Sequence, residues 1–199
     1  NKKIIDSKLL SDSFGINCLK IKTYDENNFI VKYYKDKNDE FNAIKSESRN
    51  LLFLNNLSLS YFPKVQKCNN KYLIMTYLEN NEFKPDQIKE DLLDAIISLH
   101  EIESNDFGFD FDTQIGGLKQ INRKNTSWVD FYKEQRLGYI FDIINSNCPM
   151  DSSINQKIEK LIKNLCNFIP NKPKISLLHG DLWEGNILFY NKKFVGFID

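Results

Sequence analysis

The sequence is short of the residue types on which several classes of protein depend. Its 199 residues include only 8 Gly, 5 Pro, 4 Cys and 2 His. The four cysteines, Cys18, Cys68, Cys148 and Cys166, lie far apart and form no C-x-x-C pair. This spacing argues against both a zinc site and a disulfide framework.

The sequence also has no excess of charge of one sign and no long apolar run. The 27 Lys and Arg balance the 27 Asp and Glu, so charge gives no reason to expect binding to nucleic acid or to an anionic membrane. Without a long apolar run or a secretory signal, we expect a cytoplasmic protein. The chain starts at Asn1 and stops at Asp199, within a candidate active site, so we expect a C-terminally truncated chain.

Aromatic residues, with 15 Phe and 9 Tyr, are numerous enough for a real core. Two hairpins are expected near the N-terminus, from residues 18–23 with 29–34 and from 65–67 with 72–77. A helix is expected between them over 39–57, capped by Asn38 or Asp39. Apolar spacing predicts further helices over 87–102 and 154–168. Residues 128–145 are also expected to be helical, and 105–125 is expected to be irregular.

These elements predict an α+β fold of two lobes. The small lobe, residues 1–78, holds an antiparallel sheet and one helix, and 79–86 form a hinge. The large lobe, residues 87–199, is mainly helical and incomplete at its C-terminus.

Chemistry-bearing residues gather at the C-terminal end. Asp181 follows an apolar strand expected over 175–178, Asn186 comes five residues later, and a hairpin then leads to Asp199. In kinases this spacing places a base that accepts the acceptor hydroxyl's proton beside two magnesium ligands. We therefore expect Asp181 to be catalytic and Asn186 and Asp199 to bind Mg²⁺. His179 is expected to orient the loop rather than to react.

Lys32 stands inside an apolar strand, where an unpaired ammonium is costly. It is either an edge lysine in solvent or the lysine that neutralises nucleotide phosphates. The second interpretation needs a carboxylate, and Glu47 lies on the apolar stripe of the helix expected over 39–57. We predict a Lys32–Glu47 ion pair.

Two further segments are candidates for nucleotide contact. Residues 11–17, with Gly15 and Asn17, form either a phosphate-cradling loop or a plain turn. Met75, Thr76 and Leu78 lie where a hinge would pair with adenine, although a buried strand end fits the same pattern. Asp106, although followed by Phe and Gly as in a kinase metal motif, precedes Asp181 and is interpreted as structural.

The chain resembles the fructosamine kinase (ketosamine 3-kinase) family of the aminoglycoside phosphotransferase-like, protein-kinase-like superfamily. The resemblance is carried by residues 177–186, by 107–110 with 128–136, and by Lys32 with Glu47. It implies a kinase-like fold, ATP, Mg²⁺, and phosphorylation of the sugar C3 hydroxyl of a free or protein-linked ketosamine. It also implies that the substrate cleft lies near Trp128, Tyr132, Gln135, Arg136 and Trp183.

Two alternatives to a ketosamine kinase stay open at the level of sequence. One is a kinase of another small hydroxyl compound, such as an aminoglycoside or choline. The other is an inactive nucleotide-binding fragment or pseudokinase. In addition, Trp128 and Tyr132 fit equally well as residues that pack their helix.

Overall fold

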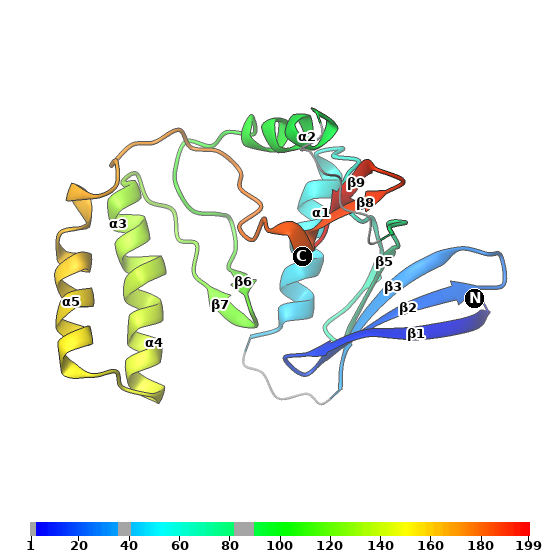
Figure 1. The fold of residues 1–199 in the computed structure, drawn as a ribbon, viewed down its shortest axis with the longest axis horizontal. Coiled ribbons are helices and arrows are strands. Elements are labelled where there is room, and N and C mark those ends of the chain that lie inside the picture. Colours follow the sequence, from blue (N-terminus) through cyan, green and yellow to red (C-terminus); the bar gives the residue numbers. More distant parts are fainter. Residues whose placement is uncertain (1–2, 36–40, 82–89) are drawn as a thin grey trace. The chain divides into compact units, whose positions relative to one another are not determined.

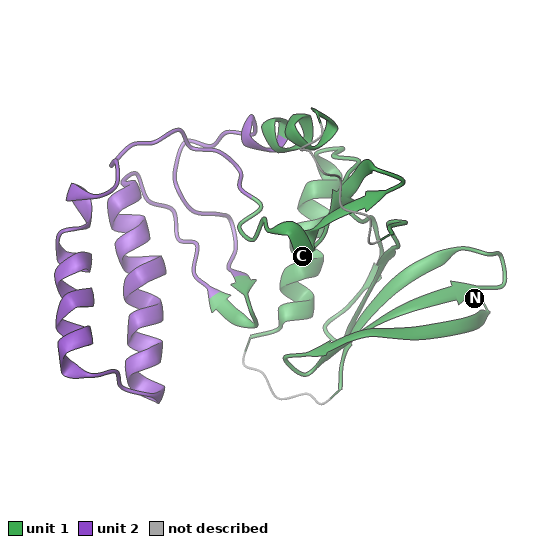
Figure 2. Cartoon of the chain, viewed as in Figure 1, with its two compact units in different colours: residues 1–98, 114–119, 179–199 green, residues 99–113, 120–178 purple. Residues whose placement is uncertain are grey.

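A computed structural model describes residues 3–35, 41–81 and 90–199. The chain separates into two compact units, residues 1–98 with 114–119 and 179–199, and residues 99–113 with 120–178 (Figure 2). No helix among the described residues has both the length and the apolar content to span a bilayer. The lobes expected at 1–78 and 87–199 are a different division, and their boundaries stay a prediction.

The first unit is built on a five-stranded antiparallel sheet of order β1-β2-β3-β5-β4 (Figure 1). Both predicted hairpins are confirmed, and a further strand, β1, precedes them. Polar residues 24–27 form the β2–β3 turn, in which the Thr23 hydroxyl donates to Asp25. The strands are β1 Ile4–Ser13, β2 Ile16–Thr23, β3 Asn28–Tyr34, β4 Val65–Cys68 and β5 Tyr72–Thr76.

Helix α1 (Ala43–Asn56) packs against β3, β4 and β5. The Asn42 side chain caps it by accepting from the Lys45 N–H at 2.7 Å. The expected cap at Asn38 or Asp39 is therefore wrong, because the Asn42 side chain satisfies that free N–H and fixes the start. Residues 38 and 39 themselves lie outside the described residues. Ile44 and Leu51 are buried on the face of α1 that also carries Glu47.

The C-terminal hairpin of β8 (Ile187–Tyr190) and β9 (Lys193–Phe197) is confirmed, with positive φ at Asn191 and Lys192 in its turn. Phe197 is fully buried, and its ring lies against Tyr61 and Phe62. The strand expected over 175–178 is wrong, since only Ser176 forms an isolated bridge, with Glu103. A single bridge to an irregular segment does not extend into a ladder.

The second unit contains a long helix that the sequence predicted, with an irregular segment that the sequence did not predict. Helix α3 (Trp128–Tyr132) runs through a π-helical segment, η1 (Lys133–Gly138), into α4 (Tyr139–Asn147). Helix α5 (Ser152–Lys163) follows, and residues 165–167 are a 3₁₀ turn, η2 (Leu165–Asn167), rather than the end of an α-helix.

The described residues also include helix α2 and a small hairpin. Helix α2 spans Glu90–His100, while the expected start at Gln87 lies outside the described residues, as do hinge positions 82–86. The stretch 105–125, expected to be irregular, contains a small hairpin of β6 (Thr113–Ile115) and β7 (Leu118–Gln120). Its Gly116 and Gly117 have positive φ, which lets the chain reverse between two strands of three residues each.

Candidate active site

Lys32 lies between two carboxylates. Its Nζ is 2.8 Å from Glu47 Oε1 and also pairs with Asp199 Oδ1. The side chains of Lys32 and Glu47 are 15% and 9% exposed, and that of Asp199 is 51% exposed. The predicted Lys32–Glu47 pair is confirmed. The second partner, Asp199, was missed, because no local pattern connects β3 to the end of a hairpin 167 residues later.

Burial and charge act in opposite directions on the titration of this cluster. Burial lowers the pKa of Lys32, but the charges of Glu47 and Asp199 outweigh it and raise the pKa above the usual range. Burial raises the pKa of Glu47, and Asp199 adds to this while Lys32 opposes it. Lys32 is therefore a firmly charged ammonium at neutral pH, as a group that neutralises phosphate must be.

Asp181 and Asn186 are joined by hydrogen bonds. Asn186 is buried in the short 3₁₀ turn η3 (Glu184–Asn186), and its Nδ2 donates to the Asp181 carbonyl at 2.8 Å and to Asp181 Oδ2 at 3.1 Å. The Asp181 side chain is otherwise exposed. The buried amide thus orients an accessible carboxylate, which is the arrangement that a general base needs.

His179 precedes Asp181 by two residues, and its ring packs on aromatic side chains. Its ring stacks on Phe62 and meets Phe197 edge-on, and the Asp181 N–H donates to Nδ1 over 3.4 Å. Burial lowers the pKa of His179 below its usual value of 6.5, although Asp181 and Asp199 oppose the shift. The neutral ring packs as the expected orienting residue would.

Because the folded protein resists protonating His179, the unfolded chain binds more protons once the pH falls below 6.5. Stability to urea is therefore expected to fall from pH 7.5 to 5.5, and His179→Phe should reduce that fall. The control His100→Gln should keep the wild-type pH dependence. If His179→Phe also keeps it, the ring does not titrate as described.

Trp183 and Gly185 have a steric relation. A Cβ on Gly185 would come within 2.4 Å of the Trp183 ring, so only glycine allows the indole to fold over the loop. The Trp183 side chain nevertheless remains 57% exposed. It offers a rigid aromatic surface beside Asp181.

Asn186 and Asp199 suit a magnesium ion by the chemistry of their atoms. Both hydrogen bonds described for the Asn186 side chain use Nδ2, which leaves the amide oxygen for a cation, and the Asp199 carboxylate is half-exposed. The Ile198 N–H donates to the Asn186 carbonyl at 3.0 Å, so the chain brings Asp199 next to Asn186. The described residues hold no cluster of three or more His, Cys, Asp or Glu suited to a metal. Mg²⁺ commonly takes one or two protein oxygens and completes its shell with phosphates and water.

The expected phosphate loop is a tight two-residue turn. Phe14 and Gly15 both have positive φ, as in the hairpin turns that match strand twist. The Gly15 carbonyl accepts from the Lys35 N–H. Asn17 pairs with Tyr33, not with Lys32, so its side chain lies on the opposite face of the sheet from Lys32 and bonds the Tyr33 hydroxyl. The geometry leaves only the main chain of Asn17 for phosphate contact.

The segment expected to be the hinge, residues 75–78, contacts the C-terminal hairpin at its end. Met75 is buried and pairs with Ile30, so it shares the face of Lys32. The Thr76 N–H already donates to the Lys64 carbonyl at 2.9 Å, so that group is not free to meet a base. The Leu78 side chain lies so close to Gly196 that an added Cβ there would come within 2.8 Å of it.

Four of the expected substrate residues, Trp128, Tyr132, Gln135 and Arg136, belong to the second unit. Trp128 packs on Phe107, Phe131 and Tyr132. Gln135 binds both the N–H and the carbonyl of Arg123, and Arg136 donates to Ile121 and Asn122. These contacts hold the loop at 121–123, and a role in binding substrate stays a prediction.

The segment Asp106-Phe-Gly has a structural explanation. Phe107 is buried and exchanges two main-chain hydrogen bonds with Asn125. Gly108 has φ of +102°, and a Cβ there would lie 2.8 Å from two carbonyl oxygens, those of Asn122 and Arg123. The phenylalanine and glycine thus serve a close backbone approach within the second unit.

Comparison with known proteins shows which family the chain is similar to. The family model for fructosamine kinase matches residues 13–199. Protein-ribulosamine 3-kinase, chloroplastic, of Arabidopsis thaliana is 36% identical over 121 residues, which make up 59% of this chain and 36% of that protein. A Vibrio parahaemolyticus protein named "Probable ketoamine kinase" is 29% identical over 163 residues, 78% of this chain and 56% of its own.

Solved structures show the same fold. A fructosamine-3-kinase candidate from Thermobifida fusca superposes with a TM-score of 0.83 at 20% identity, covering 100% of this chain and 68% of that one. The streptomycin–ATP–APH(2'')-IIa complex gives a TM-score of 0.65 at 21% identity, over 98% and 65% of the two chains. The predicted α+β kinase-like fold is confirmed.

The chain spans about a third to two thirds of the length of these proteins. With its family model matched over residues 13–199, the chain belongs to the fructosamine kinase family.

Proposed function

We propose that the protein transfers the γ-phosphoryl group of ATP to the C3 hydroxyl of ketosamines, free or attached to protein amines. The observation that carries the proposal is that Lys32, paired with Glu47, also pairs with Asp199. The residue before it, Ile198, donates its N–H to Asn186, whose side chain holds Asp181. The family and the relatives named as ribulosamine and ketoamine kinases support the acceptor class. Removal of the phosphorylated sugar from an amine would give the protein a deglycation role.

Lys32 would hold the α- and β-phosphates, and Glu47 would keep its ammonium in place. The buried pair makes this possible, since an ammonium already desolvated and oriented loses little freedom when it meets a phosphate oxygen. Gly15 and the main chain of Asn17 would lie along the phosphates. Met75, Thr76 and Leu78 would border the adenine.

Asp181 would accept a hydrogen bond from the acceptor hydroxyl and take its proton as the phosphoryl group transfers. Asn186 and Asp199 would hold Mg²⁺, which supplies positive charge to the phosphate oxygens when bound. Trp183 would border the sugar beside Asp181, and Trp128, Tyr132, Gln135 and Arg136 would also take part in binding the acceptor.

The test is an ATP-consumption assay of the intact protein with fructosamine, ribulosamine and erythrulosamine adducts, an aminoglycoside and choline. The expected result is turnover of at least one ketosamine, with kcat/KM well above that of the other acceptors. Turnover of the aminoglycoside or of choline alone would show that the protein is a kinase but that ketosamines are not its substrates. No ATP-dependent turnover of any acceptor would contradict the proposed activity.

Asp199→Ala in the intact protein is expected to abolish Mg²⁺-dependent turnover while leaving the fold unchanged. The carboxylate is half-exposed, so the hydrophobic core does not depend on it. Turnover is measured across a Mg²⁺ titration, and the fold by circular dichroism. Turnover near the wild-type rate would show that Asp199 is not the metal ligand and would direct attention to Asp106.

A further inference from the structure

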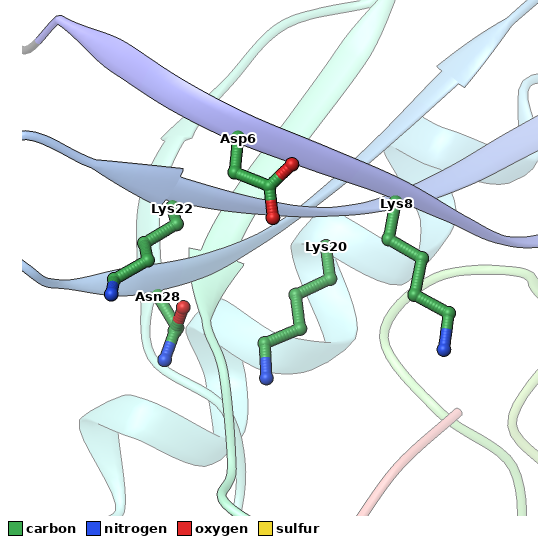
Figure 3. A pocket seen from close by; sticks show the side chains of 5 residues that line it. All are labelled: Asp6, Lys8, Lys20, Lys22 and Asn28. Carbon is green, nitrogen blue, oxygen red and sulfur yellow. The ribbon is translucent and has the colours of Figure 1, made fainter.

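Three lysines gather on one face of the five-stranded sheet. Lys8 lies on β1, and Lys20 and Lys22 lie on β2; with Asp6 and Asn28 they line a hollow of about 340 Å³. Figure 3 shows the three lysine side chains extending to the same side of the strands. The volume lies near the lower end of the range for small-molecule sites, and a phosphate or short oligophosphate would fit it.

This hollow shares a face of the sheet with Lys32. In the β2–β3 register, Cys18 lies opposite Lys32, Lys20 opposite Ile30, and Lys22 opposite Asn28. Alternate residues of a strand point to the same side and are spaced by roughly 6.6–6.8 Å along it. The lysines therefore continue the face of Lys32 along the strands.

Charge in the hollow is only partly compensated. Lys22 pairs with Glu26, and Asn28 donates to Glu79. Lys20 places its ammonium 3.7 Å from the centroid of the Tyr77 ring, a cation–π contact that holds the charge in position. Over the described ranges, neither Lys8 nor Lys20 takes part in any of the ion pairs found.

Lys8 and Lys20 stand directly opposite each other across the β1–β2 pair. Like charges in that position destabilise an antiparallel pair. An anion between the two ammonium groups would attract both and so offset their mutual repulsion. Lysine commonly binds phosphate as a point charge. Asp6, opposite Lys22, is the one carboxylate in the lining and would oppose such an anion.

We propose that the hollow is an anion subsite for a phosphate group, held by Lys8, Lys20 and Lys22. Two sources carry this chemistry: a free oligophosphate, or a phosphate on the ribose of a nucleotide that reaches along the sheet from Lys32. Binding of a free anion is independent of the phosphoryl transfer proposed above, because the lining involves none of the residues assigned to that reaction. The nucleotide-borne source rests on the proposed nucleotide site at Lys32.

The test is calorimetric titration of the intact protein with inorganic tripolyphosphate at low ionic strength. Lys8→Gln/Lys20→Gln is expected to raise Kd at least tenfold. The control Lys45→Gln/Lys67→Gln removes the same charge from exposed positions on α1 and β4 and is expected to change Kd less than twofold. An equal loss in both variants, or no measurable binding by the wild type, would overturn the proposal.

A second measurement needs no variant. Tripolyphosphate should slow amine acetylation of Lys8 and Lys20, read by mass spectrometry, while Lys45 and Lys67 in the same sample serve as unprotected references. Equal rates at all four lysines would contradict the subsite even if calorimetry detects binding.

Two arms separate the sources of the phosphate. If the subsite takes a free anion, tripolyphosphate should still bind when ADP is saturating. If it takes a nucleotide-borne group, ADP with a 3′-phosphate on its ribose should bind more tightly than ADP, and Lys8→Gln/Lys20→Gln should remove that gain. Failure of both arms would reject the subsite without bearing on the kinase reaction.

Discussion

Replacing Asp181 by Asn is expected to lower kcat for ketosamine phosphorylation by about 10²–10⁴-fold, the range in which a positioned general base contributes. The side chain keeps its size and its place beside Asn186, but it loses the negative charge that accepts the proton. Nucleotide affinity should change by less than about tenfold, or 1.4 kcal/mol, since in the proposed reaction Lys32 and the metal would hold the phosphates.

The measurement is turnover at saturating ATP, with nucleotide Kd determined separately by calorimetry. Asp106→Asn is the matched control, because it makes the same chemical change at another aspartate. Asp106 begins the Asp-Phe-Gly segment, in which Phe107 and Gly108 serve a close backbone approach. It should leave kcat within about twofold of the wild type. Near-normal turnover in Asp181→Asn would mean that the catalytic loop has been misinterpreted.

Replacing Lys32 by Met is expected to destabilise the protein by about 3–5 kcal/mol, the cost of leaving one partner of a buried ion pair uncompensated. Glu47 is nearly inaccessible and would lose its only described hydrogen-bonding partner, the Lys32 ammonium. The same change should abolish turnover. Urea unfolding at pH 7.5 measures the first effect, since the raised pKa of Lys32 keeps its ammonium charged at that pH.

The double variant Lys32→Met/Glu47→Leu separates stability from function. Replacing both charges with apolar side chains removes the buried carboxylate, so most of the lost stability should return while turnover stays absent. Lys67→Met, at an exposed position on β4, is the control and should change stability by less than about 0.5 kcal/mol. A double variant as unstable as Lys32→Met would contradict the described burial of the pair.

Local sequence patterns were enough to predict secondary structure wherever the interacting residues are neighbours in sequence. The β2–β3 and β8–β9 hairpins follow from alternating apolar residues around polar turns, and helix α5 follows from its apolar periodicity. The strand expected before Asp181 failed for the opposite reason. An apolar run becomes a strand only if a partner strand lies beside it, and here a single bridge to Glu103 is all that forms.

By itself, the sequence determined that Lys32 needs Glu47 as a partner, and it predicted the candidate reacting groups: Asp181 with Asn186, and Asp199 at the end of a hairpin. Their spacing along the chain is fixed by covalent geometry, and a charge on an apolar stripe demands a partner. Only the tertiary structure decided that Lys32 also meets Asp199, that the Asn17 side chain lies on the opposite face of the sheet, and that Lys8 and Lys20 stand opposite each other. Those relations depend on strand register, which is set by packing between segments far apart in sequence and not by any local preference.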